Sequence, residues 1–311
     1  MKDNKVLIFA IIIIIIVVGL CIGAYFYFTK DVEGDDEQIS NEPVYTAQDF
    51  PKIDASTATQ PLAMAFFKNF TGSVIEESNF NFTQTHQSYE KLIKGDVDLI
   101  LVTQPSQDEL NLAKEANIEL EVIPVVREGF VFYVNAKNPV DNLTLEQVQG
   151  IYSGEITNWS EVGGKDIAIK PYQRPANSGS QTGMTELVMK GKELMKPLTE
   201  NVVATMAGII NLVSSYDNGD AAIGYSYYYY ATTMYQTIDK EVANNIKLLS
   251  IDGVKPNIDT IKSGEYPLTT SYYIVINKAA DKDSQAKKLA DLMLSNRGQN
   301  AAKEAGYVPV K

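Results

Sequence analysis

The sequence feature that most restricts the fold is an uncharged, mostly apolar run from Val6 to Phe28. As a helix, its 23 residues would extend roughly 34 Å, enough to cross a bilayer core of about 30 Å. The apolar part of a secretory signal is usually shorter and ends at small residues, whereas this run ends in four aromatic residues. Cys21 follows a bulky leucine, and apolar residues continue after it, which disfavours a lipoprotein site. We therefore predict an uncleaved transmembrane anchor over residues 6–28.

The charges on either side of this run predict its orientation. Lys2 and Lys5 precede it, and five acidic residues crowd the stretch from Asp31 to Glu37. The positive-inside tendency then places residues 1–5 in the cytoplasm and the bulk of the chain outside the cell membrane, in single-pass topology. Residues 29–48 are acidic and lack apolar periodicity, so we expect a solvated tether.

The composition excludes several classes of function. The 311 residues carry a formal charge of −12, which disfavours nucleic acid as a partner. Cys21 is the only cysteine and His86 the only histidine, so most zinc sites are excluded and a single imidazole base is available. We expect no metal and no cofactor.

The pattern after residue 48 is typical of an α/β protein. A helix that begins after Thr85, with Tyr89, Leu92 and Ile93 on one face, ends at Gly95, and Asp98–Val102 follows as a buried parallel strand. Further strands are expected over 123–126, 129–135, 167–172 and 221–226, with helices over 143–149, 206–213 and 286–294. The strands Phe130–Asn135 and Ser271–Asn277 are alike and both end in Asn, so we expect them to cross between two lobes.

One polar stretch indicates a site for a small anion. Arg174 lies four residues before Ser178-Gly179-Ser180, between the expected strand 167–172 and an expected helix over Thr185–Met189. Glycine allows a sharp turn, the serines and a helix start supply donors, and the guanidinium matches an oxyanion. From these residues alone, a polar loop with a salt-bridged arginine is an equal alternative.

Two other helix starts carry similar chemistry. Ser56, Thr57 and Ala58 precede Pro61, which suits a first helical turn, although an ordinary N-cap is the commoner meaning of such residues. Thr85 is the expected N-cap of the helix that contains His86. For His86 a helix-start hydrogen bond is at least as good an interpretation as contact with a ligand. Tyr227–Tyr230 with Tyr235 form an aromatic wall, interpreted as packing.

These pieces together resemble the phosphate-binding proteins of phosphate ABC transporters, within the two-lobed periplasmic-binding-protein superfamily. The resemblance covers roughly residues 44–311. It rests on the order and spacing of short motifs at 54–58, 95–98, 151–159, 174–180, 223–226, 266–268, 295–299 and 306–309.

The resemblance implies a type II periplasmic-binding-protein-like α/β fold, with lobe I at 49–132 plus 272–311 and lobe II at 133–271. It also implies reversible capture of inorganic phosphate by hinge closure, and delivery to ABC transporter permease subunits. The implied phosphate-binding residues come from three stretches: Ser56, Thr57, Ala58, Thr85, His86, Arg174, Ser178, Gly179 and Ser180. Alternatives are another oxyanion such as sulfate, or a phosphate sensor subunit.

The chain departs from the family after the strand that ends at Val102. The family often has an aspartate there, which accepts the proton of phosphate, but Leu101–Ser106 contains no carboxylate. Gln104 offers an amide oxygen without charge repulsion, so selectivity against sulfate is open.

A serine-dependent phosphoester hydrolase is the rival from another class. Gly179–Gly183 resembles a nucleophile elbow only superficially, since its central residue is Gln181. The chain has no P-loop or His-Glu-x-x-His motif. We therefore expect a binding protein with no catalytic residues.

Overall fold

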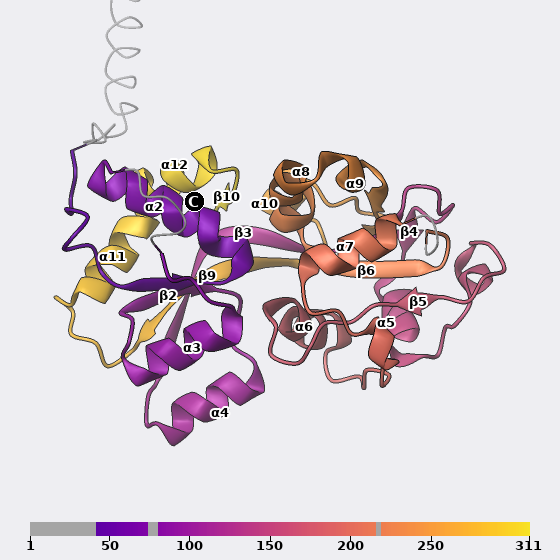
Figure 1. The fold of residues 1–311 in the computed structure, drawn as a ribbon, viewed down its shortest axis with the longest axis horizontal. Helices are drawn as coiled ribbons and strands as arrows, with labels where there is room; N and C mark the ends of the chain where they lie inside the picture. Colours follow the sequence, from indigo (N-terminus) through magenta and orange to yellow (C-terminus); the bar gives the residue numbers. More distant parts are fainter. Residues whose placement is uncertain (1–41, 74–79, 216–218) are drawn as a thin grey trace, which may run out of the picture. The chain divides into compact units, whose positions relative to one another are not determined.

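The computed structural model describes residues 42–73, 80–215 and 219–311 (Figure 1). The predicted anchor at 6–28 and residues 29–41 of the predicted tether lie outside the described residues. Within the described residues, no helix has the length and apolar character needed to cross a membrane. Residues 42–311 form one compact unit.

The core of this unit is a mixed sheet with the strand order β1-β2-β9-β3-β6-β5, in which β7 and β10 also pair with β3. Its strands are β1 (Ile53–Ala55), β2 (Leu99–Val102), β3 (Leu120–Asn135), β5 (Lys170–Pro171), β6 (Ala222–Tyr227), β7 (Ile246–Leu248), β9 (Thr269–Asn277) and β10 (Val308–Pro309). A separate parallel pair consists of β4 (Asn142–Leu143) and β8 (Ser250–Ile251). The expected parallel strand is β2, which pairs in parallel with β1 and antiparallel with β9.

Strand β3 joins the two halves of the sheet. Its residues 120–129 pair with β9, and its residues 130–134 pair with β6 (Figure 1). We predicted two strands here, over 123–126 and 129–135. The structure has one strand, since Arg127 and Glu128 keep their backbone pairing with β9. Glu128 is buried and accepts hydrogen bonds from the backbone N–H groups of Gly129 at 2.8 Å and Tyr229 at 3.2 Å.

Helices gather on the two halves of this sheet. We call the elements around β1, β2, β9 and β10 the first half and those around β5, β6 and β7 the second half. The helices of the first half are α2 (Gln60–Thr71), α3 (Thr85–Lys94), α4 (Gln107–Glu115), α11 (Gln285–Leu294) and α12 (Asn296–Glu304). Those of the second half are α5 (Leu145–Ser153), α6 (Gly179–Gly183), α7 (Met206–Ser214), α8 (Tyr235–Ile238) and α9 (Lys240–Asn244). Helix α10 (Ile258–Ser263) contacts β3 and β10, next to the junction.

Short helical segments complete the described chain. They are η1 (Thr57–Thr59), η3 (Trp159–Val162) and η5 (Thr199–Asn201), which are 3-10 helices, and η4 (Met184–Met189) and η6 (Tyr230–Met234), which are π-helical.

The alternation of β2 explains why helices cover both faces of the first half. Leu99 and Leu101 belong to the large core that includes Leu62 and Phe66 of α2. Ile100 and Val102 belong to a second core that includes Tyr89 and Leu92 of α3. A strand buried on both faces has the continuous apolar sequence seen here.

Arg297 ties the start of the described chain to the first half. Its guanidinium donates to the Glu42 carbonyl at 2.7 Å and to the side-chain oxygen of Asn69 at 2.7 Å, and it lies 5.7 Å from the ring centroid of Phe70. The backbone N–H groups of Val44 and Tyr45 donate to the Phe70 carbonyl. Residues 42–45, part of the predicted tether, thus pack against α2.

Candidate functional site

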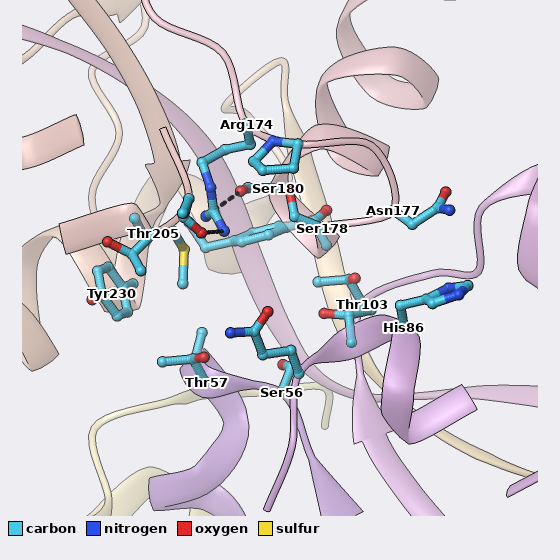
Figure 2. A pocket seen from close by; sticks show the side chains of 18 of the residues that line it. Ser56, Thr57, His86, Thr103, Arg174, Asn177, Ser178, Ser180, Thr205 and Tyr230 are labelled. Carbon is cyan, nitrogen blue, oxygen red and sulfur yellow. Dashed lines mark hydrogen bonds between the residues drawn. The ribbon is translucent and has the colours of Figure 1, made fainter. Parts of the chain in front are cut away.

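A cavity of about 460 Å³ lies between the two halves of residues 42–311 (Figure 2). Ser56, Thr57, Thr103 and His86 face Arg174, Ser178, Ser180, Thr205 and Tyr230 across it. The complete lining is Ser56, Thr57, Ala58, Gln84, Thr85, His86, Gln87, Thr103, Arg174, Pro175, Ala176, Asn177, Ser178, Gly179, Ser180, Ala204, Thr205, Met206, Ala207, Tyr227 and Tyr230. The structure therefore brings all nine residues of the predicted site to one cavity.

Three helix starts supply many of these residues. Ser56 precedes η1 and α2, Thr85 is the first residue of α3, and Ser178 is the N-cap of α6. The first N–H groups of a helix have no partner within it, and the dipole makes that end positive. We predicted Thr85 as the N-cap of α3, but the cap is Gln84, whose backbone is extended.

The Ser178-Gly179-Ser180 stretch is the first turn of a helix. We expected a turn there and a helix only from Thr185, but α6 begins at Gly179 and continues into η4. The Ser178 hydroxyl accepts the backbone N–H of Gln181 at 3.3 Å. We predicted that a turn would supply hydrogen-bond donors here. In the structure the start of helix α6 supplies them.

Arg174 is the cation of the cavity, and its side chain is held by neutral acceptors. Its Nε donates to the Val203 carbonyl at 3.0 Å, its Nη2 to the Ala204 carbonyl at 2.8 Å, and its Nη1 to the Ser180 hydroxyl at 3.1 Å. The residue is 9% exposed, and burial lowers the pKa of its guanidinium from the usual value. Across residues 42–73, 80–215 and 219–311, no carboxylate forms a salt bridge with it. Among the described residues, the guanidinium is therefore held by neutral groups, and the alternative of a salt-bridged arginine in a polar loop is not observed.

The two halves touch beside this arginine, at Gly179. A Cβ at this position would lie 2.5 Å from the Thr103 Oγ1 atom and 2.8 Å from the Thr85 Oγ1 atom, both in the first half. The Gly179 carbonyl accepts a hydrogen bond from the Tyr227 hydroxyl at 3.0 Å. Only glycine allows the start of α6 to approach the first half this closely.

The first half holds its part of the cavity through a buried carboxylate and paired hydroxyls. Asp54, in the middle of β1, accepts from the backbone N–H of Thr83 at 2.8 Å and from Lys91 Nζ at 2.9 Å. These contacts fix the segment that leads into α3. The Ser56 and Thr59 hydroxyls lie 2.9 Å apart.

His86 contacts a buried carboxylate of the neighbouring helix. Its Nδ1 atom lies 3.2 Å from Glu109 Oε1, and the other oxygen of Glu109 accepts the backbone N–H of Ser106 at 2.7 Å. Burial is the main cause that raises the pKa of Glu109. In the described part of the chain, no hydrogen bond joins His86 to Ser178 or Ser180, so the pair needed by a serine hydrolase is not formed there.

Sequence reasoning missed several lining residues. Thr103 lies in the cavity wall, whereas Gln104, which we considered as an acceptor, does not line the cavity. Thr103 is the first residue after β2, and ligands in α/β folds bind beyond the carboxyl ends of strands, so this signal was available. Tyr227 and Tyr230, interpreted as packing residues, are buried and also line the cavity.

A comparison with known families decides the family. A family model described as a PBP superfamily domain matches residues 46–297. The chain belongs to the PBP superfamily.

Relatives and solved structures agree with this family. The chain is 28% identical over 265 residues to the phosphate-binding protein PstS of Bacillus subtilis (strain 168), which covers 83% of this chain and 80% of the relative. It is 26% identical over 253 residues to the protein of the same name from Staphylococcus aureus (strain bovine RF122 / ET3-1), covering 76% of this chain and 74% of the relative.

Two solved structures share the fold. One is a putative phosphate ABC transporter substrate-binding protein with bound phosphate from Clostridium perfringens, with a TM-score of 0.64, 24% identity, and coverage of 83% of this chain and 98% of that one. The other is an ABC-type phosphate transport receptor from Vibrio cholerae, with a TM-score of 0.60, 23% identity, and coverage of 82% and 98%. The predicted periplasmic-binding-protein-like α/β fold is confirmed.

Proposed function

We propose that this protein is an extracytoplasmic solute-binding protein that captures inorganic phosphate in the cavity and delivers it to an ABC permease. The observation that carries the proposal is the buried guanidinium of Arg174, which faces the cavity without a carboxylate partner among the described residues. A buried cation held by neutral acceptors favours an anionic ligand. The relatives' printed names support phosphate as that anion.

In this proposal the nine predicted residues bind phosphate from both halves. Ser56, Thr57, Ala58, Thr85 and His86 act from the first half, and Arg174, Ser178, Gly179 and Ser180 act from the second. Each hydrogen bond to the charged ligand contributes about 1.5–3 kcal/mol. Several of them offset the cost of association and support micromolar or tighter binding.

Capture proceeds by closure of two lobes, 49–132 plus 272–311 and 133–271, about the strands that cross between them. The pairing of β3 with β9 on one side and β6 on the other supports a hinge near Gly129 and Phe130. The proposal also includes the anchor over residues 6–28, with the binding unit outside the cell membrane. Hydrolysis of a phosphoester is not part of this proposal, because the site has the features of a binding protein.

Titration calorimetry of the full-length chain in mild detergent tests the proposal. We expect saturable heat with phosphate at micromolar or lower dissociation constants. Absence of phosphate binding refutes the function. Hydrolysis of a generic phosphoester that is lost in His86→Ala supports the hydrolase instead.

A further inference from the structure

The permanent charge in the cavity lining is positive. Arg174 is the permanent cation and His86 contributes the imidazole, while the other lining side chains are hydroxyls, amides, a thioether or apolar groups. The tyrosines among them, Tyr227 and Tyr230, have pKa values raised by burial and remain neutral. No aspartate or glutamate lines this cavity in the described part of the chain.

The carboxylates nearby in the sequence are engaged with protein donors. Asp108 accepts from Asn177 Nδ2 at 2.9 Å, and Glu109 contacts His86 and the Ser106 backbone. Asp54 accepts from Thr83 and from Lys91. All three lie outside the lining, so none of them is available to accept a proton from a ligand in the cavity.

Thr103 occupies the wall where the two halves touch. It is 2% exposed, and its Oγ1 atom is buried. Its backbone is fixed, because its carbonyl accepts the Tyr89 hydroxyl at 2.8 Å. Its side chain interacts with the Tyr227 hydroxyl, and an oxygen of a ligand in the cavity would give the Thr103 hydroxyl a further hydrogen-bond partner.

A hydroxyl and a carboxylate place different demands on that ligand. A hydroxyl donates or accepts, so it pairs with either a bare or a protonated ligand oxygen. An ionised carboxylate accepts only, so it repels a bare oxygen and favours a ligand that carries a proton. A wall of hydroxyls, N–H groups and a guanidinium has no such preference.

We propose that this cavity does not require a proton on its ligand, and that Thr103 is the residue that sets this tolerance. Fully deprotonated tetrahedral oxyanions such as sulfate then bind alongside phosphate. This inference rests on the proposed function, since it concerns the ligands of the same site.

Competition calorimetry on the full-length chain in mild detergent at neutral pH tests the ligand class. We expect sulfate to bind within about tenfold of phosphate and arsenate. Sulfate binding weaker than phosphate by roughly a hundredfold or more overturns the inference and leaves the proposed function intact. Failure of all three anions to bind overturns both.

A matched pair of variants tests the role of Thr103. Thr103→Asp and Thr103→Asn have nearly the same shape and differ in charge. We expect Thr103→Asp to weaken sulfate by about a hundredfold relative to Thr103→Asn, and phosphate and arsenate, which can carry a proton, by about tenfold or less. Equal ratios for the three anions refute the assignment to Thr103. If Thr103→Asp fails to fold, the wild-type competition still decides whether the cavity requires a proton.

Discussion

The backbone N–H of Arg174 donates to the side-chain hydroxyl of Tyr225 at 2.9 Å. The same hydroxyl donates to Gln181 Oε1, which also accepts the Arg174 N–H at 3.0 Å. The buried hydroxyl of Tyr225 on β6 therefore positions both Arg174, which carries the positive charge, and helix α6, which contains Gln181. The position of the guanidinium is determined by the second half before any ligand arrives.

Removing this hydroxyl tests its positioning role. We expect Tyr225→Phe to lower the free energy of unfolding by about 1–2 kcal/mol and to weaken phosphate binding several-fold, because the backbone N–H of Arg174 then keeps only its bond to Gln181. The control is Tyr235→Phe, which removes the hydroxyl that donates to Asn211 Oδ1 at 2.6 Å, outside the cavity lining. It should show a similar loss of stability with unchanged affinity, as measured by denaturant titration and calorimetry. Equal affinity in both variants contradicts the positioning role.

Removing the guanidinium tests the site itself. Arg174→Ala should weaken phosphate binding by about tenfold or more, since a charge-assisted hydrogen bond contributes about 1.5–3 kcal/mol. Arg297→Lys is the comparison, because Arg297 is another buried arginine, bound to Asn69 and Glu42 of the first half. That variant should lose stability and keep its affinity. Unchanged calorimetric affinity in Arg174→Ala rules out the assigned site.

The close approach at Gly179 predicts a steric effect. In Gly179→Ala the new methyl group falls 2.5 Å from Thr103 Oγ1, so the halves must separate or Thr103 must move. We expect phosphate affinity to fall by about tenfold or more, and the free energy of unfolding to fall by about 1–3 kcal/mol. Gly253→Ala serves as a control, since it meets no atom within 4 Å but has a φ of +82°. Gly253→Ala should cost about 1 kcal/mol of stability and leave phosphate binding unchanged. Unchanged phosphate affinity in Gly179→Ala would falsify the close contact.

Glu128 predicts how stability depends on pH. Burial raises the pKa of this carboxyl from its ordinary value of 4.5 to about 7. Between these values the folded state binds more protons than the unfolded state, so the contribution of Glu128 to stability falls as pH rises from about 4.5 to 7 and is lost above that. The change amounts to about 3 kcal/mol.

Glu128→Gln isolates this contribution. The amide oxygen can keep the bonds from Gly129 and Tyr229, and the side chain no longer ionises. Thermal unfolding of both proteins at pH 5 and pH 8 gives the free energy of unfolding of the variant minus that of the parent. This difference should be about 1–3 kcal/mol larger at pH 8 than at pH 5. A pH-independent difference would show that Glu128 does not titrate in this range.

The site was predictable because it follows a rule of the backbone. Ser56, Thr85 and Ser178 stand at helix starts, and Thr103 follows the end of a strand; these positions converge in α/β folds. The missed tyrosines depend on tertiary packing instead. Tyr227 ends β6 and Tyr230 begins η6, and no local pattern distinguishes them from the neighbouring tyrosines that do not line the cavity.

Two of the predicted elements differ from the structure. Because glycine allows the backbone to turn sharply, we expected a turn at Ser178-Gly179-Ser180 and a helix only from Thr185. In the structure a Cβ at Gly183 would lie 2.8 Å from Phe130, so the glycines allow α6 to pack closely against β3. Likewise, we predicted two strands over 123–126 and 129–135, yet Arg127 and Glu128 between them pair with β9, and β3 is one strand.

The contacts of Arg297 with Glu42 and Asn69 determine where a mechanical load enters the molecule. A pull on the chain ahead of Glu42 acts first on α2 and α12, which belong to the same half. It reaches the second half through the strands at the junction and through contacts between the halves, such as that of Gly179 with Thr103. Glu42 is thus attached to the first half, and the half that contains Arg174 is loaded only indirectly.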